Sequence, residues 1–197
     1  MITIIDYGSG NLRSIQKSFQ RFYPKVEISR DLDLIKMSNG VILPGVGSFG
    51  DAVKELKELG LFNPLKFIVK KVPTLGICLG MQLLFSNSEE TPDVKGLEII
   101  PGIVIKLRKY ESIRIPHTGW NRLIPTADPS FKGYVYFNHS YYCSPNDKNL
   151  VISYTNHGIN VPAMILRDNI FGTQFHPEKS KKTGDEIIKY FISLIER

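Results

Sequence analysis

Short apolar runs alternate with stretches of helical spacing along the first half of the chain. Runs rich in β-branched residues predict buried strands, and apolar positions that recur every three to four residues predict amphipathic helices. The runs predict strands at Met1–Ile5, Lys25–Ile28, Val41–Leu43 and Thr74–Ile77, and the spacing predicts helices over the segment of Ile15, Phe19 and Phe22, over Asp51–Leu59 and over Leu79–Phe85. This alternation of strand and helix is typical of a parallel sheet covered by helices on both faces.

The pattern changes from about Glu98 onward, where short runs rich in Ile, Val and Tyr replace the helical spacing. Turns are expected between these runs at Pro101-Gly102, Asn146-Asp147 and Asn156-His157-Gly158. This half is therefore predicted to add mixed or antiparallel strands, including an apolar strand at Asn169–Gln174. A final helix is expected after the capping-box spacing of Thr183–Glu186, with its apolar face over Ile187–Ile195.

The predicted fold is thus an α/β fold with a largely parallel, mixed central sheet, helices on both faces and extra antiparallel strands in the second half. No repeat, linker or low-complexity stretch interrupts the pattern, so residues 1–197 are expected to form one domain. The apolar runs are far shorter than the ~18 residues that a membrane helix needs, and the N-terminus lacks the basic segment of a signal peptide. A cytoplasmic protein without a membrane partner is expected.

Composition adds few constraints. Of the 197 residues, 42% are hydrophobic and 22% are charged, which excludes disordered and fibrous classes. The net charge of +6 is spread along the chain, with short basic clusters at Lys106–Lys109 and Lys179–Lys182. This surplus fits a solvated surface, an acidic partner or an anionic substrate, and it lacks the aromatic interleaving of a nucleic-acid site. Cys78 and Cys143 have no zinc-ligand spacing, so we expect no metal and a role only as thiols.

The strongest chemical signal is Gly76-Ile77-Cys78-Leu79-Gly80, a G-x-nucleophile-x-G pattern between a predicted strand and a predicted helix. Such a sharp turn strains the backbone of the central residue, and the flanking glycines let the neighbouring backbone pass. The N-terminus of the following helix favours a thiolate, and its N–H groups, Leu79 foremost, can stabilise an oxyanion. The alternative is a small cysteine buried in a core strand.

A base for this thiol is predicted in Phe175-His176-Pro177-Glu178, which follows an apolar strand. In an extended segment His176 and Glu178 point to the same side, so the carboxylate can orient the imidazole as in a catalytic triad. A surface turn is the alternative. Of the other histidines, His117 and His157 are expected in turns without a neighbouring acid. His139 ends a strand, in a position to line the site.

A glycine-rich loop, Pro44-Gly45-Val46-Gly47-Ser48-Phe49-Gly50, follows the third strand and contains G-x-G-x-x-G. A dinucleotide site is rejected, because the loop does not open the fold and Phe62–Lys71 lacks the acid expected ~20 residues on. The loop instead lies beside the nucleophile strand, where its N–H groups can complete an oxyanion hole. A plain strand–helix turn is the alternative.

Three motifs together, GICLGMQLLF, FHPEKS and PGVGSFG, resemble those of the class I, triad-type glutamine amidotransferases. Two more, DYGSGN near the start and PHTGWN at 116–121, resemble the branch whose members supply ammonia to a cyclase of histidine biosynthesis. The resemblance covers almost the whole chain. It implies hydrolysis of the glutamine amide through a thioester, no cofactor, and a heterodimer with a barrel-shaped cyclase subunit.

The resemblance also implies roles for individual residues. Cys78 would be the nucleophile, His176 the acid and base, and Glu178 the acid that orients it. Residues that would bind glutamine or form the oxyanion strand are Gly45, Val46, Gly47, Leu79, Gln82, Glu90, His139, Ser140 and Tyr141. Those that would contact the partner are Asn11, Trp120, Tyr136 and Lys179. We also expect the free subunit to be nearly idle until the partner sets the glycine-rich loop.

Three other functions remain open at this point. A glutaminase that serves a different synthase would share the triad, but PHTGWN and DYGSGN argue against it. A stand-alone thiol hydrolase or peptidase would act without a partner and on substrates other than free glutamine. A binding subunit with an inert cysteine would not react at Cys78 with a glutamine-like electrophile.

Overall fold

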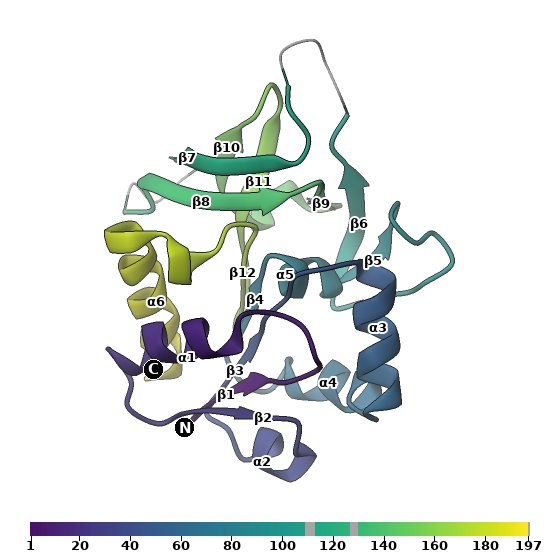
Figure 1. Ribbon diagram of the computed structural model, residues 1–197, viewed down its shortest axis with the longest axis vertical. Helices are drawn as coiled ribbons and strands as arrows, with labels where there is room; N and C mark the ends of the chain where they lie inside the picture. The colour runs from purple at the N-terminus through teal and green to yellow at the C-terminus, as the bar shows by residue number, and fades with distance from the viewer. Residues whose placement is uncertain (109–112, 127–129, 197) are drawn as a thin grey trace.

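The computed structural model describes residues 1–108, 113–126 and 130–196. In this part of the chain, a nine-stranded mixed sheet forms the centre of the molecule (Figure 1). Its strand order is β2-β1-β3-β4-β12-β11-β10-β7-β8. The parallel part consists of β1 (Ile2–Ile5), β2 (Val26–Ser29), β3 (Gly40–Leu43), β4 (Thr74–Ile77) and β12 (Ile170–Thr173). The antiparallel part consists of β7 (His117–Pro125), β8 (Gly133–His139), β10 (Val151–Asn156) and β11 (Asn160–Arg167). The predicted α/β class and the change of pattern in the second half are confirmed.

A smaller three-stranded sheet lies beside the central one. It has the order β5-β6-β9, from β5 (Phe85–Ser88), β6 (Ile100–Lys106) and β9 (Tyr141–Pro145). Helices are α1 (Leu12–Gln20), α2 (Leu32–Lys36), α3 (Phe49–Glu58), α4 (Phe62–Ile68), α5 (Leu79–Leu83) and α6 (Lys181–Ile195), with 3-10 turns η1 (Lys148–Leu150) and η2 (Pro177–Lys179). None of the helices in the described part of the chain is both long and apolar enough to cross a membrane.

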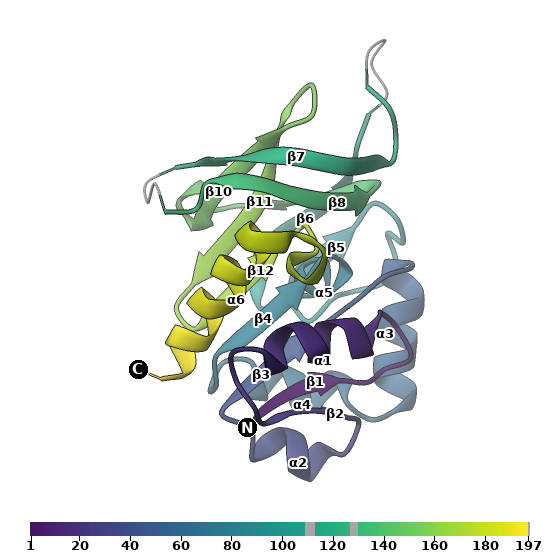
Figure 2. The same ribbon diagram turned by 60° about the vertical axis from the view of Figure 1, so that its left-hand side comes forward.

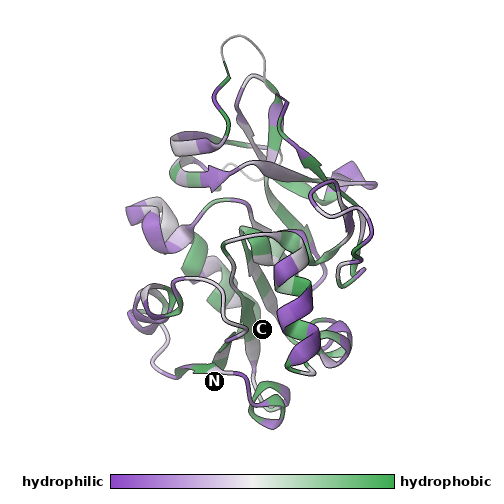
Figure 3. Ribbon diagram, turned by 45° about the vertical axis from the view of Figure 1, so that its right-hand side comes forward, coloured by the Kyte–Doolittle hydropathy of each residue, from purple (hydrophilic) through white to green (hydrophobic). Residues whose placement is uncertain are grey.

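Helices cover both faces of the parallel strands, because side chains alternate between the two faces along each strand. On one face Ile4 packs in a core with Phe19 of α1 and Phe191 of α6. On the other face Ile5, the next residue, packs in a core that α3 and α4 complete. Figure 2 shows α1 and α6 in front of the strands, and Figure 3 shows hydrophobic residues on the strands and hydrophilic ones on the outer sides of the helices.

Helix α5 is shorter than predicted, since it ends at Leu83 and Phe85 already belongs to β5. The Leu83 carbonyl accepts the N–H of Leu97, and the Leu84 carbonyl accepts that of Ile99, both at 2.9 Å or less. These carbonyls are therefore taken by another segment, so the helix cannot continue. Helix α1 is also shorter than predicted, since it ends at Gln20, before Phe22. The two short helices α2 and α4 were not predicted.

Two expected boundaries in the second half are wrong. Pro101-Gly102 lies inside β6, where Gly102 pairs with Pro145 of β9 so closely that a Cβ on it would lie 2.5 Å from the Ser144 carbonyl oxygen. Thr183–Glu186 is not a capping box, because α6 begins at Lys181, directly after η2. The turn expected at 146–147 lies between β9 and η1, and the one expected at 156–158 lies between β10 and β11 except for Asn156, which is the last residue of β10. The basic cluster predicted at Lys106–Lys109 is described only in part, because Lys109 lies outside the described residues.

Candidate active site

Cys78 occupies a sharp turn between β4 and α5, with φ 53° and ψ −107°. A non-glycine residue rarely adopts a positive φ, and the strain here lifts the side chain away from the strand. The packing explains both glycines of the motif. A Cβ on Gly80 would lie 1.7 Å from the Leu43 carbonyl oxygen, and one on Gly76 would lie 2.7 Å from the Met81 Cα. The predicted strand–turn–helix geometry is confirmed.

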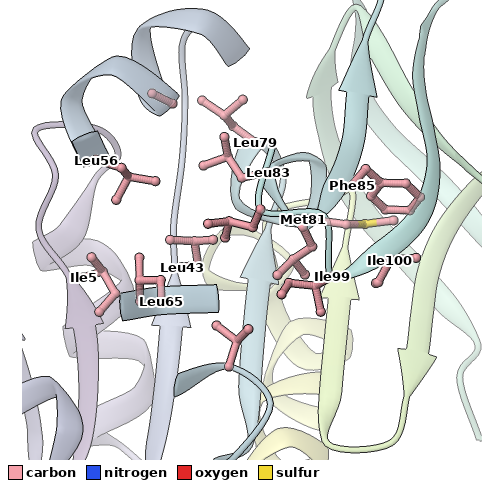
Figure 4. Close-up of a cluster of buried hydrophobic side chains, with 14 of the residues drawn as sticks. Ile5, Leu43, Leu56, Leu65, Leu79, Met81, Leu83, Phe85, Ile99 and Ile100 are labelled. Atoms are coloured by element: carbon pink, nitrogen blue, oxygen red, sulfur yellow. The ribbon is translucent and has the colours of Figure 1, made fainter. Parts of the chain in front are cut away.

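The turn is anchored by the core beneath it. Leu79, Met81 and Leu83 of α5 are buried and belong to the cluster that contains Leu43 of β3 (Figure 4). Because β3 and β4 pair in parallel, their carboxyl ends meet at one edge of the sheet. The glycine-rich loop after β3 therefore lies next to the nucleophile turn, as the sequence predicts.

His176 and Glu178 form a buried pair beyond the end of β12. The imidazole Nδ1 lies 2.9 Å from Glu178 Oε1, and the two side chains are only 4% and 2% exposed. This segment forms the 3-10 turn η2 and not the predicted extended chain. The 3-10 turn nevertheless directs both side chains toward each other. The His176 N–H donates to the Tyr136 carbonyl of β8, and the Ser180 hydroxyl donates to the His176 carbonyl, so backbone and side chain are both held.

Strand register brings this pair to Cys78. Thr173 of β12 lies opposite Ile77 of β4, and the Cys78 N–H donates to the Thr173 carbonyl at 2.7 Å. Burial tends to lower the pKa of His176, but the Cys78 sulfur and the Glu178 carboxylate outweigh it and raise this pKa to about 10. Nε2 of His176 is buried and has no hydrogen-bond partner among the described residues. The surroundings therefore favour the protonated imidazole beside the sulfur, and its Nε2 is not bonded to another described group.

A cavity of about 270 Å³ opens above Cys78. Its lining is Val46, Gly47, Cys78, Leu79, Gln82, Glu90, Pro116, Asn138, His139, Ser140 and Tyr141. The residues that the resemblance assigns to glutamine all line this cavity, with the exception of Gly45. Gly45 instead packs closely against Leu79 and Tyr7, since a Cβ on it would lie 2.7 Å from the Leu79 Cβ and 2.6 Å from the Tyr7 hydroxyl.

The loop residue Val46 is tied to a second loop by both of its backbone polar groups. The Ser9 hydroxyl accepts the Val46 N–H at 3.0 Å and also donates to the Val46 carbonyl. The Val46 N–H is therefore engaged away from the sulfur. The neighbouring Gly47 has φ +105° and no heavy atom within 4 Å of a Cβ placed on it, so its surroundings leave the peptide room to turn. The Leu79 N–H, at the start of α5, has no acceptor within the helix.

Glu90 and Gln82 close two other walls of the cavity. Glu90 Oε2 accepts the N–H of Phe49 at 2.7 Å, which fixes its carboxylate to the N-terminus of α3. Gln82 Nε2 donates to the Tyr141 carbonyl at 3.0 Å. Both contacts join elements that are far apart in the sequence, so the cavity walls hold one another in place.

His139, which lines the cavity, is joined to His117 by a hydrogen bond between the two imidazoles. His139 Nδ1 donates to the Tyr141 carbonyl at 2.9 Å, so its Nε2 accepts from His117 Nδ1 at 3.0 Å, and His117 Nε2 in turn accepts from Asn121 Nδ2. Burial and the neighbouring histidines lower the pKa of His139 to about 3 and that of His117 to about 4. The expectation that His117 lies in a turn is wrong, because it begins β7 and pairs with β8.

Three of the four residues expected to contact a partner, Trp120, Tyr136 and Lys179, lie together at η2 and the neighbouring strands. Trp120 is 47% exposed and its ring lies 6.1 Å from that of Tyr136. Lys179 Nζ lies 5.7 Å from the centre of the Tyr136 ring. Asn11 instead caps α1, because its Oδ1 accepts the Ser14 N–H. Helix α1 also contacts η2.

Two contacts to the sulfur were missed by the sequence reasoning. Gln174 Nε2 lies 3.7 Å from Cys78 Sγ, and the Asn138 carbonyl oxygen lies 4.0 Å from it. Gln174 precedes His176 by two positions, and this spacing in a strand-like segment was the available signal. No signal in the sequence pointed to Asn138. Among the described residues, no group of three His, Cys, Asp or Glu side chains lies together as metal ligands would.

Comparison with known proteins decides the family. The model of the family "Glutamine amidotransferase class-I" matches residues 3–194. The chain belongs to this family. Curated relatives named imidazole glycerol phosphate synthase subunit HisH include one from Methanococcus maripaludis, 43% identical over 99% of this chain and all of the relative. Another, from Methanocaldococcus jannaschii, is 46% identical over 99% of this chain and all of the relative.

Solved structures of glutamine amidotransferases share the fold. One, described only as a glutamine amidotransferase, has a TM-score of 0.80 and 16% identity over the full length of both chains. A glutamine amidotransferase from Thermotoga maritima has a TM-score of 0.61 and 17% identity over 99% of this chain and 83% of its own. As a class-I glutamine amidotransferase, this chain thus has the architecture that its motifs predict.

Proposed function

We propose that this chain is the glutaminase subunit of an imidazole glycerol phosphate synthase and that Cys78, His176 and Glu178 are its catalytic residues. The name of the curated relatives supports the assignment to this synthase. One observation above all others supports the proposed chemistry. A cysteine on a strained turn lies at a cavity, beside a buried imidazole that a carboxylate orients. Residues 1–197 act as one amidotransferase unit in this proposal.

The first half of the reaction forms a thioester. The Cys78 thiolate attacks the side-chain amide carbon of glutamine, a C–S bond forms, and the carbonyl oxygen becomes an oxyanion that the Leu79 N–H stabilises. The C–N bond then breaks, and the nitrogen takes the proton of His176 Nε2 and leaves as ammonia. Protonation is needed because an amide anion is a very poor leaving group.

The second half releases glutamate. Water gives a proton to His176 Nε2 while its oxygen forms a bond to the acyl carbon, and the C–S bond breaks with its electron pair returning to sulfur. Glu178 keeps Nδ1 protonated and the ring in place through both halves, as the acid of a triad does. Three side chains supply all of this chemistry, so the reaction requires no cofactor.

Substrate binding uses the walls of the cavity. In the proposal Glu90, Gln82 and the backbone of His139, Ser140 and Tyr141 hold the polar ends of glutamine. The cavity is lined by carboxylate, carboxamide and backbone groups, which suit a substrate with both an ammonium and a carboxylate group.

A barrel-type cyclase subunit receives the ammonia in this proposal, in a heterodimer whose contact surface includes Asn11, Trp120, Tyr136 and Lys179. The Gly45–Gly47 loop links this partner to the chemistry. Its Val46 N–H bonds to Ser9 in the free chain and cannot serve an oxyanion at the same time. Partner binding would release it, and loss of one such donor costs roughly 10²–10³ in rate.

Covalent labelling separates this proposal from a binding subunit with an inert cysteine. A diazoketone analogue of glutamine should modify Cys78, as peptide mapping by mass spectrometry would show. The matched control is Cys143→Ala, since Cys143 is fully buried, burial raises its pKa, and its removal should leave labelling unchanged. An absence of labelling at Cys78 would favour a binding subunit with an inert cysteine.

A further inference from the structure

Gln174 is a fully buried polar side chain beside the nucleophile. It directly follows β12, its N–H donates to the Ala163 carbonyl of β11 at 2.9 Å, and none of its surface is exposed. Because the preceding residue, Thr173, accepts the Cys78 N–H, Gln174 leaves the strand alongside Cys78. The side chain of the next residue, Phe175, is part of the core that α1 and α6 cover.

Gln82 fixes which end of the Gln174 carboxamide faces the sulfur. A backbone carbonyl can only accept a hydrogen bond, so the Gln82 atom 3.0 Å from the Tyr141 carbonyl oxygen is its Nε2 amide group. The same nitrogen lies 3.4 Å from Gln174 Oε1. The Gln174 oxygen therefore faces Gln82, and its Nε2 faces Cys78 Sγ at 3.7 Å.

The two polar neighbours of the sulfur differ in what they favour. The Asn138 carbonyl, 4.0 Å away, can only accept and thus favours the thiol. The Gln174 amide can only donate here, and a donor to the charged form favours that form. Burial strengthens this effect, since a hydrogen bond counts for more where water is excluded.

We propose that Gln174 is a further catalytic residue, whose side-chain N–H stabilises the Cys78 sulfur whenever it carries negative charge. This happens twice in the reaction. The sulfur is an anion before it attacks the amide carbon, and it becomes one again when water displaces it from the acyl carbon. His176 moves protons at both stages, whereas Gln174 keeps its own and serves as a fixed donor. The inference rests on the proposed function for its place in the reaction.

The test compares two variants that lack the donor. Gln174→Glu keeps the shape and replaces the amino group with an oxygen, and Gln174→Met keeps the length without charge. The matched control is Gln16→Glu on α1, where the same change removes a hydrogen bond to the Val26 carbonyl, away from the cavity. The rate at which iodoacetamide alkylates Cys78 is measured against pH, and kcat and KM for glutamine are measured with the cyclase subunit.

The proposal predicts that the pH midpoint of Cys78 alkylation rises by about one unit in Gln174→Met and further in Gln174→Glu. It also predicts that kcat falls roughly 10-fold or more while KM changes little. Gln16→Glu should match wild type. An unchanged midpoint with kcat within twofold of wild type would overturn the proposal, and so would loss of folding in both Gln174 variants, which would indicate a structural role.

Alkylation needs no glutamine turnover. If the wild-type complex releases no glutamate, the proposed function fails, while the alkylation profiles still report on the contact between Gln174 and the sulfur.

Discussion

His176 and Glu178 face each other across a single 3-10 turn, with 2.9 Å between Nδ1 and Oε1 and almost no exposed surface. Water does not screen this pair, so the carboxylate acts strongly on the imidazole. Together with the Cys78 sulfur it outweighs the effect of burial and holds the pKa of His176 at about 10. The carboxylate and the sulfur therefore both favour the protonated form of the imidazole.

Replacement of Glu178 by Gln should weaken the interaction that raises the pKa of His176. Loss of the negative charge lowers the pKa of His176, so the imidazolium that protonates the departing nitrogen disappears at a lower pH. The alkaline limb of the glutaminase pH profile should move to lower pH, and kcat should fall roughly 10²-fold or more. The pH dependence of glutamate release measures both. Glu58→Gln, on the surface of α3, is the control and should keep the wild-type profile; an unmoved limb in Glu178→Gln would contradict the role of this pair.

Ser9→Ala should activate the free subunit. The Ser9 hydroxyl holds the Val46 N–H and carbonyl, and without it the Val46 peptide can turn toward the cavity. Glutamate release without the cyclase should rise severalfold, because an additional donor then reaches the oxyanion. Ser18→Ala removes a hydroxyl that bonds only to its own helix and should change nothing. A free-subunit rate in Ser9→Ala at or below that of wild type would contradict this switch.

Gly80→Ala should unfold the nucleophile turn. A Cβ there would lie 1.7 Å from the Leu43 carbonyl oxygen, which is backbone and cannot rotate away. The free energy of unfolding should fall by about 3 kcal/mol, the upper range for overpacking. Gly60→Ala is the comparison, since Gly60 has a positive φ but open space around it, and the expected loss there is about 1 kcal/mol. Denaturant unfolding with equal losses in both variants would show that close packing at Gly80 is unimportant.

The fold could be predicted where the local pattern determines the element. β4 was placed correctly because four buried apolar or β-branched residues end at the glycine-flanked cysteine turn. The end of α5 could not be predicted, since the carbonyls of Leu83 and Leu84 are taken by a segment more than ten residues later. The start of α6 was misplaced for a related reason: η2 leads directly into the helix, so a capping residue at Thr183 is not needed.

The site could be predicted in part from chemistry and in part only from resemblance. The spacing of Gly76, Cys78 and Gly80 has a steric cause that the structure shows directly. Spacing alone did not reveal the cavity walls around Tyr141, because β9 reaches the site through the three-stranded sheet, which the sequence pattern does not predict. Gln174 was overlooked because its significance depends on the register of β12 against β4.

The central claim is that a single sulfur hydrolyses glutamine under the control of a partner. Glutamate release should be measured for wild type and Cys78→Ala, each with and without a cyclase subunit that carries its ribonucleotide ligand. We predict that only the complete wild-type mixture turns over rapidly. Glutamate release by the Cys78→Ala complex at the wild-type rate would contradict the account.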